Sequence, residues 1–254
     1  TGLYDLIPNT DNSFAIINQI ANNFTETWWL KDYDGSYNDG PAHGKPNFPF
    51  VGGVLAPNGK VILVPHVSDN IGIYDPNIGP DGSYNDGPAH GKVIAAFYGG
   101  VLAPNGKIIL VPYGSSCIGI YDPNIGPDGS YNDGPAHGKV IAAFYGGVLA
   151  PNGKIILVPY GSSCIGIYDP NIGPDGSYNN GPPHGRGNRA FEGGVLAPNG
   201  KVILVPFDSS CIGIYDPSDN TYNDGPEHGK HGFAFAGGVL APNGKVILVP
   251  FDSS

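Results

Sequence analysis

The sequence has few basic residues and no long apolar run, and each shortage excludes a class of protein. Its 254 residues include 12 Lys and Arg against 22 Asp and Glu, which gives a formal net charge of −10. Proteins that bind nucleic acid need clustered cations for the phosphates, so we expect no nucleic-acid partner. No apolar stretch approaches the roughly 18 residues of a membrane-spanning helix, so we expect no membrane span.

Cysteine is also scarce, with Cys117, Cys164 and Cys211 as the only three. They are spaced 47 residues apart, so each marks the same point of a repeat. An odd number cannot pair completely, and equivalent positions of a repeat are held apart by the architecture. We therefore expect small buried thiols, with no disulfide, no metal site and no cofactor.

Glycine and proline are abundant instead, at 41 and 26 residues. They lie between the short apolar runs of a repeated segment. The segment GGVLAPNGK begins at Gly52, Gly99, Gly146, Gly193 and Gly237, and residues 71–117 are identical to residues 118–164. Internal repeats of this length are typical of solenoids and propellers. Glycine- and proline-containing turns between short apolar runs indicate an all-β fold.

Each repeat carries four strand signals, illustrated by residues 96–104, 107–112, 117–123 and 129–134. Asn-Gly between the first two predicts a tight hairpin. The run at 108–111 is apolar without alternation, so we expect both of its faces to be covered. Paired glycines in the first strand suit a crowded position near a central axis.

Four strands per repeat, arranged radially, predict a five-bladed β-propeller with four antiparallel strands per blade. Residues 1–5 match the start of a third strand, and the chain ends after a second strand. We therefore expect the N-terminal strands to complete the C-terminal blade, a 2+2 closure that leaves no unpaired edge. The prediction is one domain over 1–254, with residues 7–33 inserted between strands three and four of the closing blade. A solenoid or a swapped oligomer is the alternative.

The chain resembles β-propeller repeat proteins over essentially its whole length. Its blade count is similar to that of the tachylectin-type lectins and of the five-bladed glycoside hydrolases, although the WD dipeptide, the kelch pattern and the Asp-box are absent. The lectin resemblance implies glycan binding at repeated sites, which gain strength by avidity. The hydrolase resemblance implies paired carboxylates.

One recurring candidate is the loop YN[D/N]GPxHG, which joins the fourth strand of a blade to the next blade. Together with the loop between strands two and three, it is expected to build a ligand-binding face. Its imidazoles would bracket a sugar, or they would simply bond to neighbouring backbone carbonyls. The histidines concerned are His43, His90, His137, His184 and His228.

The copies differ just after this histidine, and any asymmetric site is expected there. Blade four alone has Arg186, Arg189 and Glu192, and blade five adds His231. Glu192 with Glu227 would be the carboxylate pair of a hydrolase. The Asp75, Asp122 and Asp169 turns resemble a calcium loop superficially, but they have proline where that loop needs glycine, so a plain turn is the expectation.

The sequence thus favours a non-enzymatic, multivalent binding module for glycans. A structural or assembly domain that contacts another protein surface and a hydrolase are the alternatives. A monomeric ring is favoured over an oligomer, and an extracellular or particle-surface location over others.

Overall fold

The computed structural model describes residues 39–45, 47–92, 95–139 and 142–252. The chain divides into two units, Thr1–Gly40 and Pro41–Ser254, and the second contains every described strand. The 7–33 insertion and the two predicted closing strands lie outside the described residues. Within the described part, no helix has the length and apolarity needed to cross a membrane.

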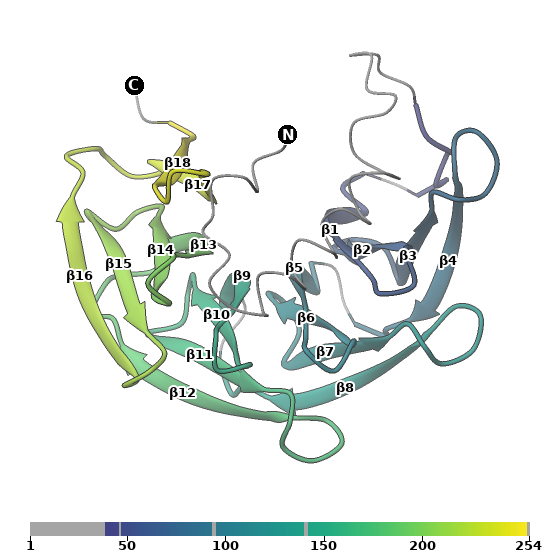
Figure 1. Cartoon of the computed structure of the whole chain (residues 1–254), viewed down its shortest axis with the longest axis horizontal. Coiled ribbons are helices and arrows are strands. Elements are labelled where there is room, and N and C mark those ends of the chain that lie inside the picture. The colour runs from purple at the N-terminus through teal and green to yellow at the C-terminus, as the bar shows by residue number, and fades with distance from the viewer. Residues whose placement is uncertain (1–38, 46, 93–94, 140–141, 253–254) are drawn as a thin grey trace, which may run out of the picture. The chain divides into compact units, whose positions relative to one another are not determined.

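The second unit consists of five repeated sheets, labelled in Figure 1. Blade one contains β1 (Phe50–Leu55), β2 (Val61–Pro65), β3 (Asn70–Asp75) and β4 (Ser83–Ala89). Blade two contains β5 (Phe97–Leu102), β6 (Ile108–Pro112), β7 (Cys117–Asp122) and β8 (Ser130–Ala136). Blade three contains β9 (Phe144–Leu149), β10 (Ile155–Pro159), β11 (Cys164–Asp169) and β12 (Ser177–Pro183). Blade four contains β13 (Phe191–Leu196), β14 (Val202–Pro206), β15 (Cys211–Asp216) and β16 (Thr221–Glu227), and blade five contains β17 (Phe235–Leu240) and β18 (Val246–Pro250).

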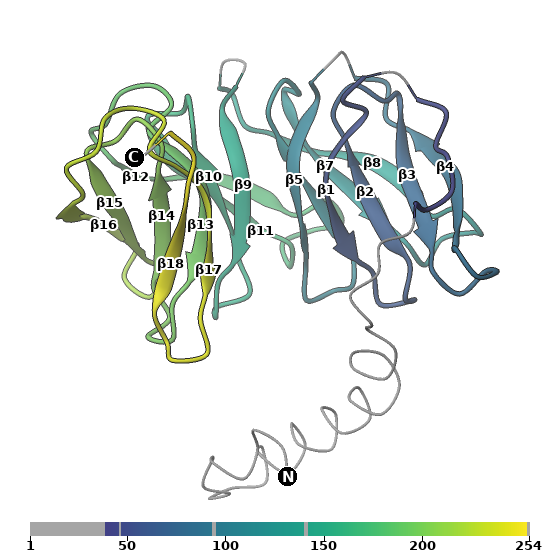
Figure 2. The same cartoon turned by 90° about the horizontal axis from the view of Figure 1, so that it is seen from above.

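The first four sheets are four-stranded antiparallel meanders, and the fifth pairs β17 with β18 among the described residues. Neighbouring blades meet along their first strands, since β1 contacts β5, β5 contacts β9, β9 contacts β13 and β13 contacts β17. Figure 1 shows these strands toward the centre and β4, β8, β12 and β16 at the periphery. Figure 2 shows the turns of the sheets at two opposite ends. The predicted all-β propeller of five repeated sheets is confirmed.

The turn between the first two strands forms as its Asn-Gly sequence predicts. In blade two, the Ala103 amide donates to the Lys107 carbonyl at 2.8 Å, and the Lys107 amide donates to Asn105 Oδ1 at 3.1 Å. Gly106 has φ of 81°, which glycine adopts without strain. This turn sets the register of the hairpin.

The two glycines in the middle of each inner strand have separate roles. Gly99 has φ of 102°, and a Cβ there would lie 3.2 Å from the Gly146 Cα of the next blade. A Cβ on Gly100 would lie 2.9 Å from a Val54 methyl and 3.0 Å from a Val64 methyl of the preceding blade. The predicted crowding at the axis is confirmed, because a larger residue would separate the blades.

The apolar second strands of blades two and three, β6 and β10, are covered on both faces, whereas β18 of blade five exposes Ile247 and Val249 among the described residues. Ile108, Ile109, Leu110 and Val111 each have 0% exposure. Burying such side chains stabilises the fold by about 1.5–3 kcal/mol each relative to exposure. The core is therefore the stack of contacts between blades, as the lack of alternation predicted. The three cysteines are free thiols. Cys211 is buried as predicted, but Cys117 and Cys164 are only half-buried, so the prediction of buried thiols is wrong for these two.

Candidate functional site

The first strands of all five blades contribute residues to one central cavity of about 480 Å³. Each strand supplies its second residue, which follows a phenylalanine, and at least one glycine of the adjacent pair. The second residues differ between blades: Val51, Tyr98, Tyr145, Glu192 and Ala236. The repeated backbone therefore presents an asymmetric set of side chains to one space.

A cluster of aromatic rings surrounds the tyrosine side of this cavity. The Tyr98 and Tyr145 ring centroids lie 3.5 Å apart, and those of Tyr145 and Tyr160 lie 5.2 Å apart. His66 packs edge-on against Tyr98, with ring centroids 5.5 Å apart, and its buried Nδ1 has no hydrogen-bond partner. Tyr113 contacts Tyr98 at 5.5 Å between centroids. Aromatic side chains of this kind can contact an organic ligand over a large area.

Glu192 is the only charged residue that lines the cavity within the described part of the chain. Burial raises the pKa of its carboxyl, and interaction with Tyr145 opposes the rise only in part. The pKa of Tyr145 is itself raised, first by burial and then by Tyr98 and Glu192. A half-buried carboxyl beside a neutral phenol can bind a cation or exchange a proton with a ligand.

Arg189 does not neutralise Glu192, although both were predicted to belong to one site. Its Nη2 lies 2.8 Å from Asp208 Oδ2, and its guanidinium carbon lies 4.6 Å from the Phe233 ring centroid. Arg189 has no resolved effect on the pKa of Glu192. Arg189 and Glu192 are only three positions apart in the sequence, yet Arg189 forms its ion pair with Asp208 and not with Glu192.

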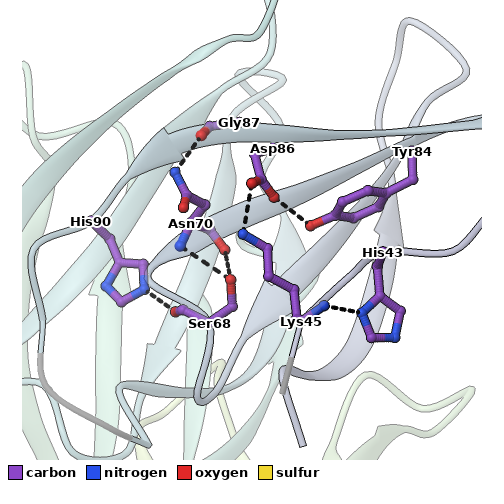
Figure 3. Close-up of polar contacts among 8 residues, drawn as sticks. All are labelled: His43, Lys45, Ser68, Asn70, Tyr84, Asp86, Gly87 and His90. Carbon is purple, nitrogen blue, oxygen red and sulfur yellow. Dashed lines mark hydrogen bonds and ion pairs between the residues drawn. The ribbon is translucent and has the colours of Figure 1, made fainter. Parts of the chain in front are cut away.

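The repeated histidines connect consecutive blades. His90 Nε2 donates to the Ser68 carbonyl of blade one at 2.7 Å, while its ring packs against Phe97 and Tyr131 of blade two. His90 Nδ1 accepts the Lys92 amide at 3.2 Å. Figure 3 shows the contact with Ser68 and, in blade one, the equivalent loop residue His43, whose Nδ1 accepts the Lys45 amide.

The same two contacts recur along the chain. His137, His184 and His228 lie 2.7–2.8 Å from the carbonyls of Ser115, Ser162 and Ser209. Each also accepts a backbone amide at Nδ1, from Lys139, Arg186 and Lys230. Both ring nitrogens therefore form hydrogen bonds within the protein. The bond to a neighbouring backbone carbonyl is the one that the alternative to sugar binding predicted for this loop. That these histidines contact a ligand stays a prediction.

These contacts predict a pH-dependent stability. Burial lowers the pKa of His90, His137 and His184, so the unfolded chain binds more protons than the folded one below about pH 6.5. Stability should be complete above that pH and decline as pH falls below it, because protonated Nδ1 cannot accept the amide. Melting temperatures measured between pH 7.5 and 5 should show this decline. His137→Gln should reduce the slope, whereas exposed His231→Gln should leave it unchanged.

The other predicted residues lie on the outer part of blade four or in exposed loops. Arg186 Nε donates to Asp224 Oδ1 at 3.0 Å, and its Nη2 lies 3.0 Å from Cys211 Sγ. His231 is exposed in the loop before β17. Glu227 ends β16, the outermost strand, while Glu192 belongs to innermost β13. Three strand spacings of about 4.8 Å exceed the separation of a hydrolase carboxylate pair.

The aspartate turns form as plain turns. Asp75, Asp122 and Asp169 each accept, at Oδ1, the amide of the asparagine two residues later at 3.0 Å. Among the described residues, no group of three or more His, Cys, Asp or Glu side chains could hold a metal ion. The calcium interpretation of these turns gains no support from this arrangement.

Tyr98 and Tyr145, which line the cavity, and Tyr160, which packs against Tyr145, were not predicted from the sequence. A signal was present for the first two, because they lie in the segment after the loop histidine where the copies disagree. They were passed over because blades two and three share them. Two identical residues within a ring of five still make an asymmetric site.

No family model matches this chain, and no curated protein is similar to it in sequence. Solved structures are similar in fold. Virginiamycin B lyase from Staphylococcus aureus has a TM-score of 0.65 and 16% identity, over 88% of this chain and 76% of the lyase. A streptogramin B lyase has a TM-score of 0.61 and 14% identity, over 83% and 72% of the two chains. A protein proposed to be a gluconolactonase has a TM-score of 0.54 and 16% identity, over 78% and 70%.

These neighbours correct one expectation. Repeated blades were taken to indicate a protein without enzymatic activity, and that inference is wrong, because neighbours with this propeller architecture are enzymes. A propeller needs only one asymmetric set of side chains at its axis to act on a substrate. The tachylectin-type resemblance stays a prediction. What the comparisons establish is a β-propeller fold shared with proteins of mixed function.

Proposed function

We propose that this protein binds a small organic ligand at one asymmetric site in its central cavity, and that a glycan end group is the leading ligand class. The observation that carries the proposal is the set of side chains after the inner phenylalanines. The flanking phenylalanine and glycines are the same in every blade, whereas these five positions hold Val51, Tyr98, Tyr145, Glu192 and Ala236. Tyrosine rings and one carboxylate suit a ligand with both an apolar face and hydroxyl groups.

We favour ligand binding at one central site over binding at the repeated histidine loops that the sequence indicated. In the loops, the described histidine contacts are directed at the protein's own backbone. The cavity, by contrast, has tyrosine and carboxyl groups with access to its interior. One ligand per chain is therefore the expected stoichiometry.

Calorimetric titration of the chain with mono- and oligosaccharides tests this function. We expect one site per chain, with Tyr98→Ala weakening binding about three- to tenfold through lost aromatic contact. Glu227→Gln, on the outer strand of blade four, serves as the control and should bind normally. Several equivalent sites per chain, or binding that Tyr98→Ala leaves intact, would contradict the central site.

Proton transfer to or from the bound molecule is a second candidate function. Glu192 favours it, since burial raises its carboxyl pKa toward the range of a general acid or base, and lyases share the fold. A structure of catalytically inactive virginiamycin B lyase contains quinupristin, so quinupristin is a suitable first substrate. Mass spectrometry of the product should detect conversion by the native chain and none by Glu192→Gln.

A further inference from the structure

As far as the described residues form it, the central cavity combines one carboxyl with mostly uncharged surroundings. Glu192 is half-buried, and of the groups named around it only the Tyr145 hydroxyl has a resolved effect on its pKa. Arg189, the nearest arginine along the chain, pairs with Asp208 and lies over Phe233. None of the cations in the described part of the chain forms an ion pair with this carboxyl. A half-buried carboxylate in such surroundings is unfavourable, so the cavity favours an occupant that supplies a positive charge.

We propose that the ligand of this cavity carries an organic ammonium group, which lies beside Glu192 while the rest of the molecule packs against Tyr98, Tyr145 and the glycine backbone. This inference rests on the proposed central binding site and names the chemistry that the site selects. Among glycan end groups, a neutral sugar would leave the carboxylate uncompensated and an anionic sugar would be repelled, whereas an amino sugar would supply the positive charge. An ammonium ion would be attracted both by Glu192 and by the tyrosine rings.

A metal ion is a poorer match for the same carboxyl. Calcium needs six to eight oxygen ligands, and within the described residues no cluster of three acidic, histidine or cysteine side chains occurs. The lining is formed instead by Val51, Ala236, two tyrosines and the glycines. Such a lining accommodates the carbon atoms of an organic cation, and the overall charge of −10 favours its approach.

The test compares pairs of ligands that have nearly the same shape and differ in charge. Choline and 3,3-dimethylbutan-1-ol form one pair, and glucosamine and glucose form the other. We expect the charged member of each pair to bind at least about tenfold more tightly at pH 7 in calorimetric titrations. Preference in the choline pair alone indicates a methylated ammonium ligand, and preference in both indicates any ammonium group.

Glu192→Gln provides the matched variant, and Glu227→Gln the control. Glu192→Gln should lose the preference for the charged member while it keeps binding of the neutral member. It should also melt at a higher temperature at neutral pH, because it removes a half-buried charge, so lost binding cannot be ascribed to unfolding. Glu227→Gln should retain the preference.

The outcomes separate this inference from the proposed function. Equal binding of charged and neutral ligands at a Tyr98-dependent site would overturn the ammonium inference and leave the central site intact. Ammonium binding that Glu192→Gln does not change would also overturn the inference. If Tyr98→Ala changes the binding of none of the ligands, or none binds, both are wrong.

Discussion

Phe144→Ala is expected to lower the free energy of unfolding by about 3–5 kcal/mol, the usual cost of a large core cavity. Phe144 has 0% exposure, and its ring centroid lies 5.7 Å from that of His137 and 6.1 Å from that of Tyr178. A Cβ on Gly166 would lie 2.8 Å from the Phe144 ring, so the ring fits closely over that strand. Thermal melting should shift downward by roughly 10 °C.

The repeat itself supplies the comparison for this substitution. Phe97 occupies the equivalent position of blade two, also at 0% exposure, and Phe97→Ala should have a similar cost. Ile172→Ala is the control, because Ile172 lies in an exposed turn with 53% exposure, and it should change stability by less than about 0.5 kcal/mol. A loss for Phe144→Ala no larger than that of Ile172→Ala would contradict the packing described.

Much of the fold could be predicted because the same turn, strand and glycine motifs recur in each of the five copies. Each of these motifs predicts one local structure that fits every copy. The Asn-Gly pair predicts a hairpin turn, the continuous apolar run at 108–111 predicts a strand buried on both faces, and the paired glycines predict a crowded inner strand. Sequence identity between copies then fixes the number of sheets without any knowledge of side-chain contacts. The closing strands remain predictions, because residues 1–38 lie outside the described part of the chain.

The lining of the cavity could not be predicted in the same way, because a bulge changes the alternation of the inner strands. Phe97 pairs with Pro112 and Gly100 with Leu110, so the register shifts between them. Phe97 therefore turns into the blade, while Tyr98 reaches the cavity. Simple alternation along the strand does not specify which residue faces the axis.

The geometry of the loop before β13 also explains why Arg189 pairs with Asp208 and not with Glu192. Arg189 has φ of 57°, a conformation that non-glycine residues adopt rarely. It reaches Asp208 in the loop between β14 and β15, and Asp208 also accepts the Phe233 amide at 3.1 Å. The spacing alone could not show this, because an arginine three residues before a glutamate is equally consistent with an ion pair between the two.

Glu192→Lys is expected to weaken ammonium binding severely, the largest functional effect that a single substitution in this cavity should produce. Two unit charges 4 Å apart interact by about 4 kcal/mol at an effective dielectric constant of 20, and partial exposure of Glu192 reduces this value. Replacing attraction by repulsion should still weaken choline binding by at least about 100-fold, which corresponds to about 2.7 kcal/mol. Titration calorimetry measures this loss directly.

The reversed charge should change which ligand is preferred as well as how tightly it binds. A lysine beside Tyr145 would favour a carboxylate, so Glu192→Lys should bind 3,3-dimethylbutanoate more tightly than choline, whereas the native chain should prefer choline. Glu227→Lys makes the same change in net charge on the outer strand of blade four, so it controls for the overall field of the protein. If Glu227→Lys weakened choline binding as much as Glu192→Lys, the attraction would come from the acidic surface in general. A loss confined to Glu192→Lys assigns the recognition of charge to Glu192, the one carboxyl among the described residues that lines the central cavity.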